Sequence, residues 1–503
     1  MEGTTANHSV LIAAGFLVLC IIVAYFRRKT SDYFVQMGIP GPKPWPLIGN
    51  MHTLMKMGMG KFDQFMLNRY GSVVGYYEGS RPALLTKNFE LLRHILIKDF
   101  NCFQNRRVLV DFDPPFDQIL TTLTDDTWRR VRGHLAPAFS SGRIKKLSGH
   151  INQCADLLRD NLTKLNCKEP FDVKHRTASY TLDVIGRVAF GLELDSQNHP
   201  DDPFVRHISD IFKPRFMFLL SMALPKLVRL LNRLFGLTVF PPTPLEFLRR
   251  ITEKLINERQ AQQQKSPDFL QHMVDVLSNK GTAKGMTREE IAAQSILFFV
   301  AGIETTASTL TLLCYSLAIN PDIQRRVTSE IDEVIGSKET IEHEDCLRLT
   351  YLDQCLRETL RLYSPSFRVD RVCSEAVTIK GIDFPKDMLV YIPINAIHMD
   401  PDLWPEPEVF NPSRFDPDVR SHHEPLAWLP FGVGPRNCIG MKLAWLEVMT
   451  AMVKLLQVIE LRPCRQTQIP LEFSKSTIRQ TNKPVILTIQ RRTQKGNRTQ
   501  YEH

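Results

Sequence analysis

The chain has 503 residues, 43% of them hydrophobic and 23% charged, and a formal net charge of +9. This length suits one large domain or two ordinary ones, and the composition is that of a globular protein. The mild positive excess indicates an anionic surface or an acidic protein as partner and is too weak to indicate nucleic acid. None of the ten cysteines forms a C-x-x-C pair, which argues against a zinc ribbon, and we interpret most of them as small buried residues.

The first 29 residues carry a membrane-targeting signal. Residues 10–26 are an uncharged, mostly apolar run, and three cations, Arg27, Arg28 and Lys29, follow directly. A helix of this length reaches ~25 Å, near the low end for spanning a bilayer. A cleaved signal peptide carries its cations before the apolar run, so residues 1–29 are predicted to be a retained anchor, with the bulk of the chain in the cytosol.

Residues 30–50 are predicted to link this anchor to a domain. The stretch IPGPKPWPLIGN, residues 39–50, places four prolines within seven positions. Proline fixes its own backbone and cannot continue a helix, so this segment is expected to be a stiff, extended hinge.

Residues 51–490 are predicted to form one mainly α-helical domain with a minor β-sheet, followed by a polar tail over residues 491–503. A strand, a glycine-containing turn and a second strand are expected over residues 72–86. Helices with short links dominate the middle of the domain. Strands return over residues 376–394, and a last hairpin is expected over residues 474–489.

A long helix is predicted to start at the capping box Thr287–Glu290 and to end before Pro321. About 33 residues make ~50 Å of helix. Because this segment is apolar nearly all round, it should cross the interior of the domain. A short polar patch, Glu304-Thr305-Thr306, interrupts it near its middle.

A second apolar-rich zone covers residues 212–242. Lysines, arginines and Pro225 interrupt it, so it cannot span a membrane. Two interpretations stay open: an ordinary core helix, or an element that lies on the protein surface and dips into a membrane.

A single cysteine stands in a glycine-rich stretch, PFGVGPRNCIG, over residues 430–440. The glycines let the backbone approach another group closely, and an apolar-periodic helix begins directly afterwards. Free backbone N–H groups at that helix start, with Arg436 nearby, stabilise the Cys438 thiol as a thiolate. Such a thiolate is either a nucleophile or a metal ligand. The absence of histidine between His423 and His503 favours the ligand, although a histidine from elsewhere could supply the base.

The motif F-G-x-G-x-R-x-C-x-G over residues 431–440 resembles the haem-thiolate loop of the cytochromes P450. Other motifs of that family follow in the expected order along nearly the whole chain. Trp128 to Arg132, for example, is similar to the W-x-x-x-R of its C helix. The resemblance implies the cytochrome P450 fold, of the microsomal type, preceded by one N-terminal transmembrane helix.

Two further motifs carry structural residues of the family. Glu358 to Arg361 is similar to the E-x-x-R of its K helix. Arg414, in NPSRF, stands where the family has the arginine of P-E-R-F, and Ser413 replaces the acid. Since the arginine of the charged cluster is retained, we expect little effect from that change.

The resemblance implies haem b as cofactor, with the thiolate of Cys438 as the metal ligand. The two haem propionates need cations, and arginine binds a carboxylate through two hydrogen bonds. By motif position, the cofactor-binding residues are expected to be Arg106, Trp128, Arg132, Arg371, Phe431, Arg436, Cys438 and Gly440.

The polar patch of the long helix resembles the A-G-x-[DE]-T-T of the family. By that resemblance Gly302 leaves room over the iron, and Glu304 and Thr305 are the catalytic acid–alcohol pair that supplies protons to bound oxygen. In the alternative, Thr305 and Thr306 donate hydrogen bonds to their own helix. An unpaired buried carboxylate is costly, so Glu304 inside an apolar helix favours the catalytic interpretation.

The implied activity is insertion of one oxygen atom of O2 into lipophilic substrates of the steroid, fatty acid or xenobiotic type. No flavin or nicotinamide fingerprint occurs in the chain, so electrons are expected from a separate protein. The resemblance implies that this protein is an NADPH-dependent cytochrome P450 reductase, with cytochrome b5 as a further donor. The basic stretch over residues 128–147 is a candidate docking face, and a merely solvated charged surface is the alternative. The expected location is the endoplasmic reticulum membrane.

The resemblance also implies which segments surround a substrate. Val300, Ala301 and Ser366 are the expected contacts. They lie within a set of largely apolar segments, which suits lipophilic substrates: residues 103–123, 204–242, 298–305, 365–369 and 474–479.

Stretches such as PFGVGPRNCIGMKLA are most similar to the group that holds subfamily 3A and thromboxane synthase. An endoperoxide isomerase of the second type needs neither oxygen nor a reductase and lacks the threonine of the acid–alcohol pair, so Thr305 favours a monooxygenase. A non-enzymatic haem sensor or electron carrier has no use for that pair, which argues against both.

Overall fold

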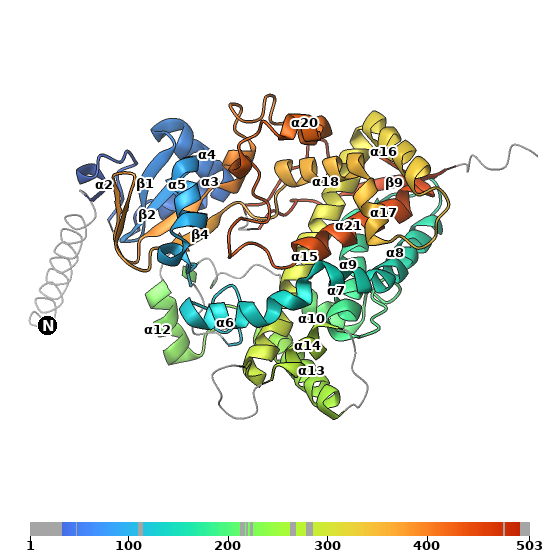
Figure 1. The fold of residues 1–503 in the computed structure, drawn as a ribbon, viewed down its shortest axis with the longest axis horizontal. Helices are drawn as coiled ribbons and strands as arrows, with labels where there is room; N and C mark the ends of the chain where they lie inside the picture. Colours follow the sequence, from blue (N-terminus) through green and yellow to red (C-terminus); the bar gives the residue numbers. More distant parts are fainter. Residues whose placement is uncertain are drawn as a thin grey trace, which may run out of the picture.

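Helices make up most of the molecule, and the strands of the largest sheet gather at one end of it (Figure 1). The computed structural model describes residues 33–492, except residue 47 and residues 109–113, 212–216, 218–219, 222–224, 262–267, 278–284 and 476–477. The expected mainly helical fold with a minor sheet is confirmed. The predicted membrane anchor, residues 1–29, and nearly all of the polar tail, residues 491–503, lie outside the described residues.

The α-helices are distributed along the whole described chain. They are α2 (Tyr33–Gln36), α3 (Met51–Met57), α4 (Met59–Tyr70), α5 (Phe89–Arg93), α6 (Asp125–Leu135), α7 (Ser141–Lys146), α8 (Ser148–Thr163), α9 (Val173–Phe190), α10 (Pro203–Ile211), α12 (Pro225–Phe235), α13 (Pro242–Ala261), α14 (Phe269–Asp275), α15 (Arg288–Ile319), α16 (Pro321–Val334), α17 (His343–Arg348), α18 (Thr350–Leu362), α19 (Ile394–His398), α20 (Pro417–Arg420) and α21 (Met441–Leu456).

The described strands form three small sheets. The largest has the order β1-β2-β7-β4, in which only β2 and β7 are parallel, and the others have the orders β3-β9-β8 and β5-β6. The strands are β1 (Val73–Glu78), β2 (Arg81–Thr86), β3 (Phe171–Asp172), β4 (Val369–Val372), β5 (Val377–Ile379), β6 (Ile382–Phe384), β7 (Leu389–Ile392), β8 (Ile459–Arg462) and β9 (Ile486–Arg491).

Two of the three expected strand regions form as predicted. The hairpin over residues 72–86 is β1 and β2, and the strands over residues 376–394 are β5, β6 and β7. The hairpin expected over residues 474–489 is different. Its second half is β9, which pairs with β3 and β8 rather than with residues just before it, and Phe473 and Thr481 form only an isolated bridge.

The long helix α15 begins and ends where the sequence predicts. Glu290 N donates to Thr287 Oγ1 at 3.1 Å, and Thr287 N donates to Glu290 Oε2 at 2.9 Å, which is the predicted capping box. Among the described residues, α15 alone is long and apolar enough to cross a membrane, and 72% of its most apolar window is buried inside the protein. The helix therefore crosses the interior of the domain, as Figure 1 shows.

Hydroxyl groups of α9 hold the middle of α15 in place. Thr181 Oγ1 donates to the carbonyl of Ile303 at 3.3 Å, and Thr177 Oγ1 donates to the carbonyl of Ala307 at 3.2 Å. Both carbonyls flank the polar patch of α15. The two helices thus meet through hydrogen bonds as well as apolar contacts, and this fixes the patch relative to α9.

The segment predicted as a stiff, extended proline hinge packs onto the domain. Phe34 and Ile39 are buried, and Gly75 N in β1 donates to the carbonyl of Pro40 at 2.9 Å. A Cβ at Gly41 would lie 1.8 Å from the carbonyl oxygen of Gly75, so only glycine permits this approach. The described part of the predicted linker therefore belongs to the folded domain, because its apolar side chains pack beside β1.

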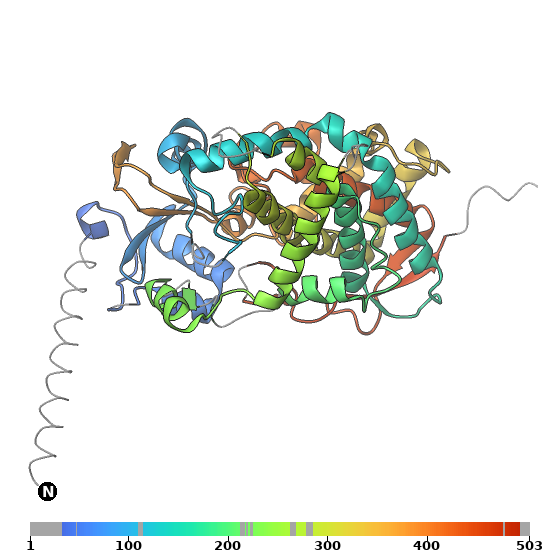
Figure 2. The same cartoon turned by 90° about the horizontal axis from the view of Figure 1, so that it is seen from below.

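Helix α12 presents an apolar face to solvent. Val228 is buried, whereas Leu227, Leu230, Leu234 and Phe235 are 41%, 50%, 62% and 69% exposed. In Figures 1 and 2, α12 lies at the same end of the molecule as α2 and the largest sheet. Of the two interpretations open for residues 212–242, the described part favours a surface-lying element over a core helix.

Candidate functional site

The cysteine loop is a tight turn that delivers Cys438 to the start of α21. Gly432 and Gly434 have φ of +66° and +76°, and a Cβ at Gly434 would lie 2.0 Å from the carbonyl oxygen of Leu96. Cys438 N donates to the carbonyl of Phe431 at 2.8 Å, which closes the loop. The glycines are thus required by backbone conformation and by contact with neighbouring chain.

The thiol group of Cys438 faces a cavity. Burial within the surrounding protein raises its pKa, and the backbone N–H groups of Gly440 and Met441 and the cations Arg132 and Arg106 oppose that rise. Gly440 is the N-cap residue of α21, so the N–H groups at the start of this helix face the sulfur, as the sequence predicts. A metal ion at this position would strongly favour the thiolate.

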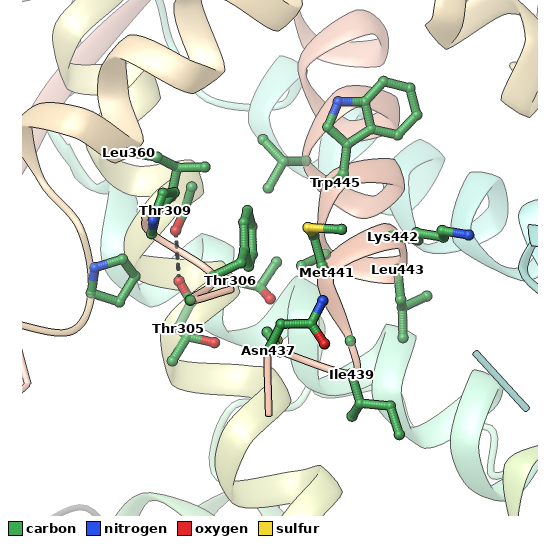
Figure 3. A pocket seen from close by; sticks show the side chains of 18 of the residues that line it. Thr305, Thr306, Thr309, Leu360, Asn437, Ile439, Met441, Lys442, Leu443 and Trp445 are labelled. Atoms are coloured by element: carbon green, nitrogen blue, oxygen red, sulfur yellow. Dashed lines mark hydrogen bonds between the residues drawn. The ribbon is translucent and has the colours of Figure 1, made fainter. Parts of the chain in front are cut away.

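The cavity lies between the middle of α15 and the cysteine loop and encloses about 1030 Å³. Figure 3 shows Thr305, Thr306 and Thr309 on α15, with Asn437 of the loop and Met441 of α21 across the space from them. Most of its walls are apolar and aromatic. They include Leu120, Ile185, Leu297, Phe298, Ile394 and Phe431.

Two buried guanidinium groups, those of Arg436 and Arg371, and the half-buried guanidinium of Arg106 lie near one another beside the loop. Arg436 is 4% exposed and donates hydrogen bonds to the carbonyls of Gln104 and Leu123 at 2.7 and 2.6 Å. Arg106 Nη2 donates to the carbonyl of Arg436 at 3.1 Å. Burial, with repulsion from Arg106 and Arg371, lowers the pKa of Arg436 to about 8. Burial and Arg106 likewise lower the pKa of Arg371 to about 9.

Helix α6 contributes two further predicted residues to the cavity wall. The ring of Trp128 lies 4.3 Å from Cζ of Arg436, a cation–π contact. Arg132 Nη2 donates to Asn437 Oδ1 at 2.9 Å, and burial lowers the pKa of Arg132. Both side chains line the cavity.

These residues fit the haem that the sequence implies. Nε of Arg106 and Nε of Arg371 are buried and have no hydrogen-bond partner within the described part of the chain. Asp370 offsets the positive charge of Arg371 and Arg436 only in part, because the pKa of both remains lowered. An anion beside these groups would satisfy them, and haem carries two carboxylates. Arg371 is not among the described residues that line the cavity, but its buried charge lies close to that of Arg106, which does line it.

Glu304 has a partner that the sequence analysis missed. The ammonium group of Lys174, in the first turn of α9, forms an ion pair with Glu304 and donates to Ser308 Oγ at 2.9 Å. The argument that Glu304 would be an unpaired buried carboxylate was therefore wrong. Lys174 lies 130 residues earlier in the chain, and no local pattern around it indicates this contact.

Thr305 lines the cavity, and its hydroxyl donates to the carbonyl of Ala301 at 2.7 Å. The alternative in which Thr305 bonds to its own helix is thus the arrangement observed. Gly302 lines the cavity, and a Cβ there would lie 2.6 Å from Cδ1 of Ile185 in α9, so a larger residue would displace the end of that side chain.

The three expected substrate contacts do not all reach the cavity. Ala301 and Ser366 line it, and Ser366 Oγ donates to the carbonyl of Arg368 at 2.7 Å. Val300 is not among the described residues that line the cavity and packs against the main hydrophobic core. The reason is helical geometry, because successive residues of α15 point about 100° apart.

The predicted charged cluster is fully buried. Glu358 and Arg361 are both 0% exposed and form two hydrogen bonds of 2.7 and 2.8 Å. Arg414 Nε lies 3.3 Å from Glu358 Oε1, and the main-chain N–H of Asn411 donates to the same oxygen at 2.9 Å. The carboxylate of Glu358 is therefore contacted by Arg361, by Arg414 and by the main-chain N–H of Asn411. This holds although Ser413 stands where the family has an acid.

Comparison with known proteins now identifies the class. The family model of cytochrome P450 matches residues 39–489. This chain therefore belongs to the cytochrome P450 family and is an oxidoreductase of the monooxygenase type. Membership implies haem with a cysteine thiolate ligand.

Among curated proteins, the chain is similar to members of subfamily 3A over nearly its whole length. Cytochrome P450 3A56 of Fundulus heteroclitus is 37% identical over 492 residues, which are 96% of this chain and 98% of that protein. Cytochrome P450 3A25 of Mus musculus is 35% identical over 483 residues, 94% and 95% of the two chains. Cytochrome P450 3A9 of Rattus norvegicus is 36% identical over 494 residues, 96% and 97% of the two.

Proposed function

We propose that this protein is a haem-thiolate monooxygenase in which Cys438 is the axial ligand, and that it oxidises lipophilic substrates. The observation that carries this proposal is the thiol of Cys438, which faces a cavity beneath the polar patch of α15 and beside buried cations. When bound, haem would supply the activation of molecular oxygen.

Several residues of this chain would hold the haem and order the water beside it. Arg106, Arg132 and Arg371, with Trp128, would hold the propionates, and the first N–H groups of α21 stabilise the thiolate of Cys438. The hydroxyl of Thr305 donates to Ala301, so its oxygen remains free to accept a hydrogen bond from water in the cavity. Glu304 lies on the side of α15 that faces Lys174. From there it would supply protons to that water, through a further water molecule or after a rotation of its side chain.

The proposed electron source is a separate NADPH-dependent cytochrome P450 reductase, with cytochrome b5 as a second donor. Support comes from the basic stretch over residues 128–147, in which Arg143 and Lys146 of α7 are exposed to solvent. The same stretch includes Trp128 and Arg132, which line the cavity. A partner with an acidic surface could thus approach the haem side of the molecule.

The proposed location is the endoplasmic reticulum membrane, with residues 1–29 as a single-pass anchor, residues 51–490 as the cytosolic catalytic domain and residues 491–503 as a polar tail. The exposed apolar face of α12 supports a second membrane contact. The apolar cavity supports lipophilic substrates of the steroid, fatty acid or xenobiotic type.

The ligand assignment can be tested by substituting Cys438. Reduced wild-type protein under carbon monoxide should show the red-shifted Soret band of a thiolate-bound haem. Cys438→His should keep a haem ligand but lose that band, and Cys438→Ala should lose the band as well. Retention of the band in Cys438→Ala would exclude Cys438 as the ligand.

A further inference from the structure

A buried histidine joins the charged cluster of α18 to the start of the cysteine loop. His398, the last residue of α19, is 0% exposed. Its Nε2 accepts a hydrogen bond from the main-chain N–H of Leu429 at 2.8 Å. Its Nδ1 lies 3.2 Å from the carbonyl oxygen of Arg361.

These two partners fix the state of the ring. A main-chain N–H can only donate and a carbonyl can only accept, so Nδ1 of His398 carries the hydrogen and Nε2 is bare. The ring is therefore neutral and held as one tautomer. Burial, followed by the charges of Arg361 and Arg479, lowers the pKa of His398 to about 3, which keeps the ring neutral at physiological pH.

The contact with Arg361 is reciprocal. Arg361 Nη1 donates to the carbonyl of His398 at 2.7 Å, while the His398 ring binds the carbonyl of Arg361. The guanidinium of Arg361 is in turn held by Glu358 through two hydrogen bonds. The ring of His398 is thus bonded to the backbone of a residue that belongs to a fully buried ion pair.

Leu429, the other partner of the ring, begins the turn that leads to the thiol. Gly432 N donates to the carbonyl of Leu429 at 3.0 Å, and Cys438 N donates to the carbonyl of Phe431 at 2.8 Å. Hydrogen bonds and short stretches of backbone therefore connect Arg361 through His398 and Leu429 to the backbone of Cys438.

We propose that His398 is a positioning residue for the cysteine loop: its neutral ring couples the buried Glu358–Arg361 pair to Leu429 and so fixes the place of the Cys438 thiol. The inference rests on the proposed ligation by Cys438. Without the ring, the N–H of Leu429 would stay buried without an acceptor, and a buried orphan donor is strongly disfavoured. The loop would then open locally, and the sulfur would leave its position more often.

The test compares His398→Leu with a matched variant, Gln324→Leu, in the full-length chain. Gln324 is 2% exposed, and its side chain accepts from Leu461 N at 2.8 Å and donates to the carbonyls of Leu461 and Leu317 at 2.9 and 3.2 Å. It is also a buried side chain that binds a main-chain N–H, but at β8 instead of the cysteine loop. Both variants should therefore lower the melting temperature.

Two readouts should separate the variants. Amide hydrogen exchange over residues 426–440, in protein with and without haem, should become roughly tenfold faster in His398→Leu, as expected for one lost buried hydrogen bond. The red-shifted band of the reduced carbon monoxide complex should also decay roughly tenfold faster in His398→Leu. Gln324→Leu should change neither rate. Equal rates in the two variants, or no change in His398→Leu, would overturn the proposal.

A milder variant and a ligand control complete the design. His398→Gln retains an oxygen that can accept from Leu429, so intermediate rates are expected, and it serves if His398→Leu does not fold. Unchanged rates in His398→Gln in that case would also count against the proposal. Survival of the band in Cys438→Ser would overturn the ligation by Cys438 instead, while the exchange rates without haem would still judge the role of His398.

Discussion

Glu304 and Thr305 are neighbours in α15, but their side chains make unrelated contacts. The carboxylate of Glu304 is held by Lys174 of α9, and the hydroxyl of Thr305 faces the cavity while it donates to the carbonyl of Ala301. The acid and the alcohol are therefore not joined directly in this state. Water between them, or a rotation of one side chain, is needed to pass a proton.

Replacement of Thr305 by Ala should separate electron entry from product formation. The haem loop and the basic face stay intact in Thr305→Ala, so NADPH should be consumed at a comparable rate in the presence of a reductase. Proton delivery should falter, because no hydroxyl orders the water. Hydroxylated product should fall, by ~10²–10⁴-fold at most, and hydrogen peroxide should rise. NADPH consumption, product and peroxide are measured together.

The same measurements distinguish a monooxygenase from an endoperoxide isomerase. An isomerase needs neither NADPH nor oxygen, so its turnover should be indifferent to both and to Thr305→Ala. Rapid rearrangement of an endoperoxide by wild-type protein without a reductase, with no NADPH-coupled hydroxylation of any lipophilic compound, would contradict the proposed function.

His398 should make the stability of the protein sensitive to acid. Its pKa is lowered from 6.5 to about 3 in the folded state, so between these values the unfolded chain binds a proton that the folded chain does not. Stability from this group is therefore present above pH 6.5 and is lost as the pH falls, by at most about 1.4 kcal/mol per pH unit.

The His398→Gln variant lacks this titration. Its free energy of unfolding in urea should consequently fall less than that of wild type between about pH 7 and about pH 5. Parallel pH profiles for the two proteins would show that His398 does not titrate on unfolding in this range.

At the scale of elements, α15 shows what local sequence can and cannot predict. Its capping box, its length and its buried course follow from Thr287, Glu290 and an unbroken apolar run. Its contacts with α9 do not, because Lys174 and Thr177 lie far away in sequence and look like ordinary residues of a helix start. Periodicity specifies which elements form, whereas the pairing of distant polar groups depends on the assembled fold.

The cysteine loop was predictable for a different reason. Its chemistry is concentrated in a few consecutive residues, so the thiol, the glycines and the helix start could all be assigned from the sequence. The supporting contact from His398 could not be assigned, since it comes from another element and through a main-chain N–H.

Helix α12 should bind membranes through its exposed leucines. In protein that lacks residues 1–29, the double variant Leu230→Ser with Leu234→Ser should bind lipid vesicles at least about tenfold more weakly, because each buried leucine contributes about 1.5–3 kcal/mol. Vesicle sedimentation measures the bound fraction. Haem binding should be unchanged, since both side chains are exposed to solvent.

The control substitutes two equally exposed residues elsewhere on the molecule. Val409 and Val419 are 51% and 45% exposed, and Val419 lies in α20, at the top edge of Figure 1, whereas α12 lies at the lower left. Val409→Ser with Val419→Ser should leave vesicle binding as it is. Truncated protein that stays entirely in solution without detergent or high salt would argue against any membrane contact by α12.

At the scale of the whole molecule, the buried cations beside the cavity have two opposite effects. Each one lowers the stability of the haem-free protein, and each one strengthens the binding of haem. Among the described residues, Nε of Arg371 has no hydrogen-bond partner, and burial together with repulsion from Arg106 lowers the pKa of this side chain. Arg371→Met should therefore stabilise haem-free protein, by about 1–4 kcal/mol if the new side chain packs well. The same variant should release haem faster, because a propionate loses a partner.

Urea unfolding of haem-free protein and the rate of haem transfer to an acceptor protein measure these two effects. A loss of stability in the haem-free variant, or an unchanged rate of haem release, would contradict this prediction. The charge of Arg371 would then stabilise the fold and have no role in haem binding.

This arrangement has a consequence for the amount of finished protein in a cell. A newly made chain without haem keeps like charges buried side by side, and its stability is lower than that of the filled molecule by the free energy of haem binding. Chains that remain empty unfold more often and are removed sooner by quality control. The supply of haem, in addition to the rate of protein synthesis, would therefore determine the amount of folded, haem-containing protein in the cell.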